Sequence, residues 1–154
     1  MLNHRFGLWL LLFLALYPVA MRAQFKQRIP IELHWQGVAE ERNEHDTLLY
    51  IALEEGLYEG PMPVFCASFP IYDDAVKAEV VLQDVKTTQL STEERIVSQD
   101  YVYDSDFHID VAPLRSRDEA LLSVRIVPFR QKGDVIEKLL SATLLVTLTP
   151  EMPT

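Results

Sequence analysis

The sequence of 154 residues predicts an all-β fold, namely an antiparallel β-sandwich of about seven strands. Two observations lead to this prediction. Apolar and polar residues alternate with a period of two in several separate segments, which is typical of strands that bury one face. Glycine and proline residues stand between these segments and mark turns, while convincing helical spacing is rare.

The first predicted strand is "IPIELHW" at residues 29–35, in which every second residue is apolar. A polar loop is expected over residues 37–46. The apolar run at 47–58 predicts a second strand, and the prolines and glycine at 59–63 interrupt regular structure. The short aromatic segment at 64–72 fits an edge strand or an extended segment.

A long strand is predicted at residues 76–90, "VKAEVVLQDVKTTQL". Its apolar residues alternate up to Leu82 and change phase at Val85, which predicts a β-bulge. Ser91 and Glu94 follow with the spacing of a capping box, in which each side chain bonds the main-chain amide of the other residue. One turn of helix is therefore expected after the strand.

Alternation returns in three segments of the second half, at residues 107–111, 122–126 and 142–148. Each places apolar side chains on one face and polar side chains on the other, so each predicts a strand with a buried face. The segment 134–142 also fits a short helix, but the β-branched residues that follow it favour a strand throughout.

A hairpin is predicted between the last two of these strands. Pro128 ends the first strand because proline has no main-chain donor, and Phe129 is expected to fold back over the core. Residues 130–134 form the predicted loop, with Gly133 at a position of positive φ. The strand at 142–148 then returns as the expected partner strand.

Residues 1–23 are predicted to be a signal peptide. A weakly basic start precedes an apolar stretch at 8–19, which is too short to span a bilayer comfortably, and cleavage is expected after Ala23. We therefore expect an exported protein with a β-sandwich domain at 24–150, a tail at 151–154 and no membrane span in the mature chain.

Charge and cysteine content narrow the functional classes. The formal net charge is −9, and binding to nucleic acid needs clustered lysine and arginine, so a nucleic-acid partner is not expected. The single cysteine, Cys66, cannot form an intramolecular disulfide. Because it lies among apolar residues, we expect a buried and unreactive thiol.

Residue types that can perform catalysis or hold a metal are present without a recognisable arrangement. A nucleophilic cysteine needs a nearby base, but His34 and His108 fall on outward-facing strand positions and His45 falls in a polar loop. The stretch 100–110 contains four aspartates and His108, yet it lacks the spacing of a calcium loop. We therefore predict no catalytic residues, no metal ligands and no cofactor.

Several short stretches, taken in order, resemble one family. They are "HWQGV" (34–38), "EGPMPVFCASFPI" (59–71), "AEVVLQDV" (78–85), "QLSTEE" (89–94) and "LLSVRIVPFRQKGDVIEKLLSATLLV" (121–146). Together they are similar to the N-terminal domain of PorU, the sortase or C-terminal signal peptidase of the type IX secretion system of Bacteroidetes. A related β-rich segment is the propeptide of gingipain-type cysteine peptidases.

The resemblance implies a non-catalytic domain. In that family the catalytic His–Cys pair belongs to a caspase-like domain downstream of the matching region, and Cys66 does not match the nucleophile. The implied partner is a protein, either the sortase catalytic domain or another component of the type IX secretion system. The implied location is the periplasm or the outer-membrane cell surface.

Two other functions stay open at this point. A gingipain-like propeptide would inhibit a cysteine peptidase or assist its folding, and Arg130 or Lys132 would then mimic a basic substrate residue. Phe129, Arg130 and Lys132 are therefore the predicted partner-contact loop, although a plain hairpin explains the same residues. The third function is a stand-alone exported module that binds a protein or glycan through exposed aromatic residues. Its candidate residues are Tyr58, Tyr72, Tyr101 and Tyr103.

Overall fold

The computed structural model describes residues 24–151, so the predicted signal peptide and residues 152–154 lie outside the described residues. These residues form ten strands and one short helix. In chain order the elements are β1 (Phe25–Glu32), β2 (Trp35–Arg42), β3 (Thr47–Leu53), β4 (Gly56–Tyr58), β5 (Pro63–Pro70), β6 (Val76–Gln89), α2 (Thr92–Val97), β7 (His108–Ser116), β8 (Glu119–Val127), β9 (Phe129–Lys132) and β10 (Val135–Pro150). Within this part of the chain, no helix has the length and apolar character needed to cross a membrane.

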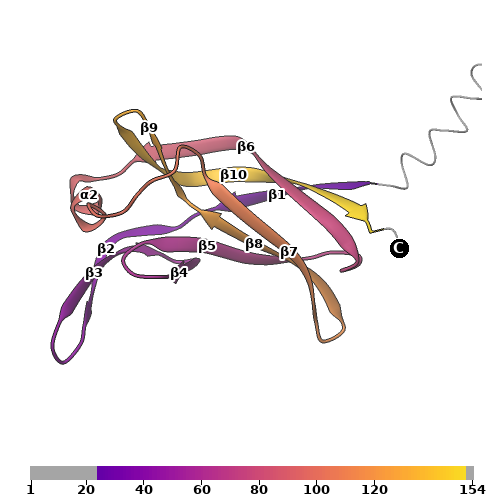
Figure 1. The fold of residues 1–154 in the computed structure, drawn as a ribbon, viewed down its shortest axis with the longest axis horizontal. Helices are drawn as coiled ribbons and strands as arrows, with labels where there is room; N and C mark the ends of the chain where they lie inside the picture. Colours follow the sequence, from indigo (N-terminus) through magenta and orange to yellow (C-terminus); the bar gives the residue numbers. More distant parts are fainter. Residues whose placement is uncertain (1–23, 152–154) are drawn as a thin grey trace, which may run out of the picture.

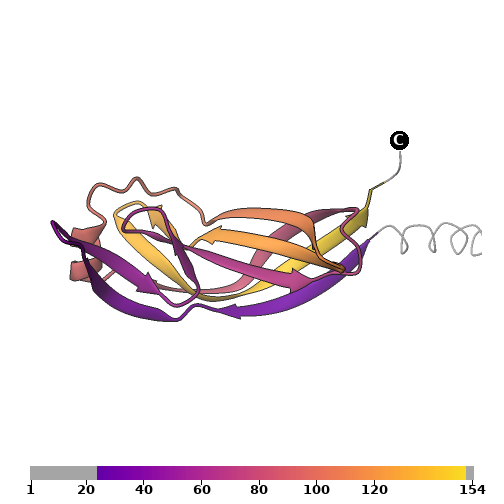
Figure 2. The same ribbon diagram turned by 90° about the horizontal axis from the view of Figure 1, so that it is seen from below.

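Two larger antiparallel sheets face each other, which confirms the all-β prediction (Figures 1 and 2). One sheet has the order β1-β10-β6 with β9 paired to β10, and the other has the order β4-β5-β8-β7. The strands β2 and β3 form a separate hairpin, which extends away from the sandwich (Figure 1). The start of β1 and the end of β10 lie together at the opposite end of the molecule.

Alternating strand residues fill the space between the two sheets, as the sequence predicts. In β8, Leu122, Val124 and Ile126 are completely buried, and in β10 the same holds for Leu144 and Val146. Burying one such side chain contributes about 1.5–3 kcal/mol. Because β8 and β10 belong to opposite sheets, their contact holds the two layers together.

The predicted pairing of the strands at 122–126 and 142–148 is wrong. β8 pairs with β5 and β7 in one sheet, whereas β10 pairs with β1, β6 and β9 in the other. Pro128 stands where the chain passes between the sheets, a position where a strand ladder ends because proline cannot donate. The hairpin that does form joins β9 to the start of β10, and Gly133 in its turn has the predicted positive φ, 60°.

The segment predicted as a loop at 37–46 is a strand up to Arg42. These residues belong to β2, whose polar side chains stand opposite the apolar run of β3. The strand is held by cross-strand pairing rather than by a buried face of its own. All of its residues are exposed or half-buried, so the alternation of apolar and polar residues does not reveal this strand.

The predicted bulge and helical turn are both confirmed. In β6, Asp84 and Val85 stand opposite one residue of β10, and Asp84 has a φ of 51°. The helix α2 begins after Ser91, whose Oγ accepts a hydrogen bond from the Glu94 amide at 3.1 Å, and Glu94 Oε1 accepts one from the Ser91 amide at 3.0 Å. The segment 134–142, which also fits a helix by sequence, lies in the strand β10 apart from its first residue.

Candidate functional site

The predicted partner-contact loop is only partly accessible. Phe129 is 1% exposed and packs on Trp35, with 5.3 Å between the ring centroids. The guanidinium of Arg130 lies 2.9 Å from the Glu137 carboxylate, and its central carbon lies 4.6 Å from the centre of the Phe107 ring. Lys132, at the end of β9, is exposed. Contact of this loop with a partner stays a prediction, and Lys132 is the member of the set that can make it directly.

Cys66 differs from its expected environment. Its neighbour Phe65 is 3% exposed and takes the core-facing position in β5, so alternation along the strand places Cys66 on the opposite face. The thiol is therefore half-buried rather than buried. His34, His45 and His108 are exposed, as expected from the sequence.

A cluster of ionisable groups that the sequence pattern does not reveal lies where β1 meets β2. His34 follows β1, and Glu54 and Glu55 form the turn between β3 and β4. Ligand atoms of the three residues lie within 4.8 Å of one another, close enough to contact one metal ion. The His34 ring contacts the Glu55 carboxylate directly and lies 3.8 Å from that of Glu54. In residues 24–151 no other group of three His, Cys, Asp or Glu side chains converges in this way, the stretch 100–110 included.

The contact between His34 and Glu55 changes the acidity of both groups. The hydrogen bond to Glu55 raises the pKa of His34 above its ordinary value, and the nearby carboxylates add to this effect. Partial burial opposes ionisation of Glu55, yet its hydrogen bonds with His34 lower the pKa of the carboxyl group. The two residues therefore form an ion pair whose strength depends on pH.

We expect this ion pair to stabilise the domain most strongly between about pH 4.5 and 6.5, the ordinary pKa values of the two groups. The raised pKa of His34 makes its contribution complete below pH 6.5, and this contribution disappears as the pH rises through the value in the folded state. The lowered pKa of Glu55 makes its contribution disappear as the pH falls. Titration of the His34 ring by NMR should show a pKa above 6.5 that decreases in the Glu55→Gln variant.

The Glu54→Gln variant is the matched control for this titration. Glu54 acts on His34 only through charge at longer range, so its substitution should lower the pKa of His34 less than the Glu55 substitution does. An equal decrease in both variants would show that the direct contact with Glu55 is not the main cause.

A second feature that the sequence does not reveal is a buried ion pair between the helix α2 and the strand β10. Lys138 Nζ of β10 donates to both carboxylate oxygens of Glu94, at 3.0 and 2.8 Å. Glu94 is 3% exposed and Lys138 9%, and the ammonium also lies 5.0 Å from the centre of the Trp35 ring. This pair fixes α2 against β10.

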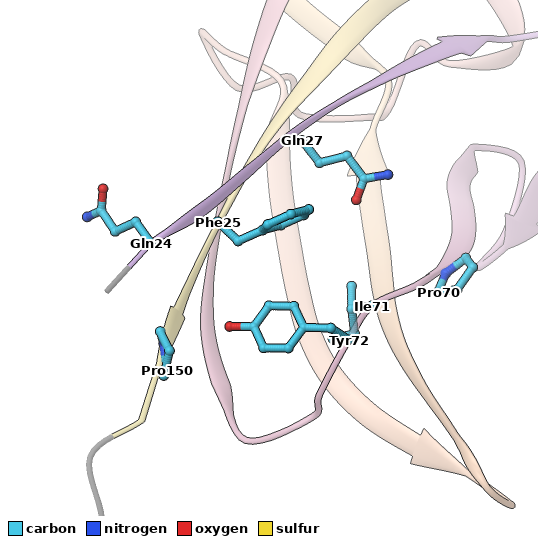
Figure 3. A pocket seen from close by; sticks show the side chains of 7 residues that line it. All are labelled: Gln24, Phe25, Gln27, Pro70, Ile71, Tyr72 and Pro150. Atoms are coloured by element: carbon cyan, nitrogen blue, oxygen red, sulfur yellow. The ribbon is translucent and has the colours of Figure 1, made fainter. Parts of the chain in front are cut away.

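An apolar cleft of about 560 Å³ lies at the end of the sandwich where the two described chain ends meet (Figure 3). We name it the end cleft; it is lined mainly by Phe25, Pro70, Ile71, Tyr72 and Pro150. The rings of Phe25 and Tyr72 face each other edge to face, with 5.8 Å between their centroids. Both are about half exposed, at 49% and 57%.

A larger cleft of about 690 Å³, which we name the hairpin groove, lies beside β2 and β3. Its lining includes Leu48, Leu49, Tyr50, Tyr58, Glu40 and Glu41. The two leucines are 55% and 44% exposed, although leucine is usually buried. The rings of Tyr50 and Tyr58 pack edge to face at 5.2 Å. Apolar side chains and carboxylates therefore stand side by side on an open surface.

The tyrosines proposed as an aromatic binding surface do not form one group. Tyr58 and Tyr72 are exposed and line the hairpin groove and the end cleft, respectively. Tyr101 and Tyr103 are half-buried and pack against each other and against Phe129. Tyr58 and Tyr72 are therefore the more accessible members of this set.

The fold is similar to that of gingipain propeptide domains. No protein-family model matches the sequence, and the search of curated proteins finds no relative. A chain in the complex of the pro- and mature domains of RgpB from Porphyromonas gingivalis matches 82% of this chain and 78% of its own length, with 12% identity and a TM-score of 0.52. A structure that addresses the zymogenic latency of gingipain K from the same organism matches 81% of this chain and 100% of its own length, with 9% identity and a TM-score of 0.50.

At this level of identity the comparison establishes the fold and not the function. The chain has a β-sandwich of the gingipain-propeptide type. The resemblance to gingipain propeptides inferred from sequence agrees with this result, while the finer resemblance to the sortase domain stays a prediction.

Proposed function

We propose that this chain is a non-catalytic, protein-binding domain that packs against a cysteine-peptidase-type catalytic domain and controls its activity or folding. The observation that carries this proposal is the fold similarity over most of the chain to the pro-domain of a complex between pro- and mature domains. Two clefts with exposed apolar side chains, at opposite ends of the molecule, give such a domain surfaces for a protein partner.

A finer form of the proposal concerns the partner and the compartment. The ordered stretches between residues 34 and 146 favour a catalytic domain of the type IX sortase class as the partner, with this chain as its leading domain. The apolar leader at 8–19 favours export to the periplasm or the outer-membrane surface. In the third hypothesis the chain is a stand-alone exported module, which binds a protein or glycan through the same clefts and has no peptidase as its partner.

Chemical cross-linking of the protein in its native cells, followed by mass spectrometry, tests the proposal. We expect cross-links to a catalytic domain of the cysteine-peptidase class, either in the same polypeptide or in a separate protein. Addition of the purified chain to that catalytic domain should change its peptidase activity or its refolding yield. Cross-links only to proteins without such a domain would contradict the proposal and favour the stand-alone module.

Substitution of Lys132 distinguishes between the loop and the clefts as the contact surface. If the β9–β10 turn enters the peptidase cleft as a basic substrate mimic, Lys132→Ala should weaken inhibition. Lys77→Ala is a suitable control, because Lys77 is an exposed lysine on a different strand, β6. Equal inhibition by both variants would remove the loop from the proposed contact.

A further inference from the structure

The strand β3 has a main-chain edge that is covered at one end. At Leu53 the hydroxyl of Tyr58 accepts a hydrogen bond from the amide at 2.8 Å and donates one to the carbonyl at 3.3 Å. At Ile51 the amide donates to the carbonyl of Pro61 at 3.0 Å. These partners lie outside the pair formed by β2 and β3, so they occupy the edge of β3 that faces away from β2.

The next two positions of the same edge, Leu49 and Thr47, are open. Successive residues of a strand direct their main-chain groups to alternate sides, so these groups point in the same direction as those of Ile51. In residues 24–151, no hydrogen bond joins them to a segment outside the β2–β3 pair. β3 contains no lysine or proline, the residues that commonly protect an edge from an added strand. By contrast β1, an edge strand of the sheet that contains β10, carries Pro30.

The side chains around this open edge are apolar and have acidic neighbours. The pairing register places Glu41 opposite the exposed Leu48 and Glu40 opposite the exposed Leu49. Glu40 makes a 3.7 Å ion pair with Arg42, and no ion pair of the described residues involves Glu41. A carboxylate beside an exposed leucine is complementary to apolar residues that stand next to lysine or arginine, since long basic side chains cover apolar surface while their charges reach the carboxylates.

We propose that the hairpin groove binds an extended segment of a partner protein, which adds as a third strand to the open edge of β3. The segment carries apolar residues and at least one lysine or arginine. Main-chain hydrogen bonds to Leu49 and Thr47 provide affinity, and the leucines and glutamates provide specificity. This inference rests on the proposed function, because it assigns partner binding to one surface and states the chemistry of the partner. The β2–β3 hairpin lies at the end of the molecule opposite the start of β1 and the end of β10 (Figure 1).

Selection of peptides against the purified full chain tests this inference. The probe is a phage-displayed library of random peptides of about ten residues, the upper range of strand lengths. We expect enrichment of sequences in which apolar or β-branched residues alternate and are combined with lysine or arginine. No enrichment above an unrelated protein, or enrichment of acidic peptides, would overturn the inference.

Variants of the chain locate the binding site of an enriched peptide. Leu49→Lys should weaken binding by about tenfold or more, because it introduces a charge at the centre of the apolar contact. The double variant Glu40→Gln, Glu41→Gln should weaken binding and reduce its dependence on salt. The matched control is Val81→Lys on β6, where the valine is 58% exposed. Unchanged affinity in a folded Leu49→Lys variant would exclude the groove.

Methylation of peptide amides tests whether the segment binds as a strand. Two versions of an enriched peptide are methylated at alternate main-chain amides, one at the odd positions and one at the even positions. Only one set of amides faces the edge of β3 in an added strand, so one version should lose binding and the other should retain it. Equal affinity of the two versions would contradict strand addition.

The two proposals fail in different ways. If a peptidase-type catalytic domain binds the chain but Leu49→Lys leaves that binding unchanged, the groove is wrong and the proposed function stands. If the groove selects basic, apolar peptides but no catalytic domain is found, the proposed function is wrong and the groove stands.

Discussion

Replacement of Lys138 by alanine is expected to lower the free energy of unfolding by about 3–5 kcal/mol, because it leaves the buried carboxylate of Glu94 without its cationic partner. The carboxylate is 3% exposed and accepts two hydrogen bonds from the ammonium. Glu94 also closes the capping box of α2, because its carboxylate accepts a hydrogen bond from the amide of Ser91. Loss of the lysine therefore disturbs both the helix and its attachment to β10. Equilibrium unfolding in urea measures the change.

The control for this prediction removes both charges at once. In the double variant Glu94→Gln, Lys138→Met, glutamine can still serve the capping box and methionine retains much of the apolar stem of the lysine. Replacement of a buried ion pair by neutral groups is often close to neutral in stability, so we expect most of the loss to be recovered. A double variant as unstable as Lys138→Ala would show that packing, rather than an unpaired charge, causes the loss.

Replacement of Phe129 by alanine is expected to lower the free energy of unfolding by about 3–5 kcal/mol, because it leaves a cavity in the core. The ring is 1% exposed and packs in a hydrophobic cluster with Ile51, Met62 and Leu90. Its contacts with neighbouring aromatic rings are lost together with the buried area. Thermal or urea unfolding of the variant measures this effect.

Lys132→Ala is the comparison for Phe129, because both residues belong to the predicted contact loop. Lys132 is exposed, so its removal should change stability by no more than about 0.5 kcal/mol. Any effect of Phe129→Ala on partner binding would then follow from loss of folded protein, whereas an effect of Lys132→Ala would report contact. A stable, fully folded Phe129→Ala protein would contradict the burial on which this interpretation rests.

Local patterns of the sequence predict the strands that have one buried face. The alternation of Leu122, Val124 and Ile126 is a direct result of burial between two sheets, and the structure confirms it. β2 leaves no such pattern because none of its residues is fully buried in the two-stranded hairpin. The pairing of β10 could not be predicted. Alternation with a period of two indicates which face of a strand is buried, but it does not indicate which strand lies alongside.

The candidate sites depend on contacts between residues that are distant in the chain. The capping box of Ser91 and Glu94 is a local signal and was predictable, but the partner Lys138 lies 44 residues from Glu94. The cluster of His34 with Glu54 and Glu55 likewise requires the turn after β3 to meet the end of β1. The hairpin groove depends on an open strand edge, which is a property of the topology.

The central position of β10 has a consequence for the order in which the domain forms. It is the last of the ten strands in the described chain, yet it lies between β1 and β6 and holds both of them in the sheet. Pairing of Phe25 with Leu148 closes almost the whole described chain into one loop, and contacts of such long range form slowly. During synthesis from the N-terminus, β1 and β6 therefore have no central partner until residues 135–150 emerge. The native sheet can therefore form only when this final strand becomes available.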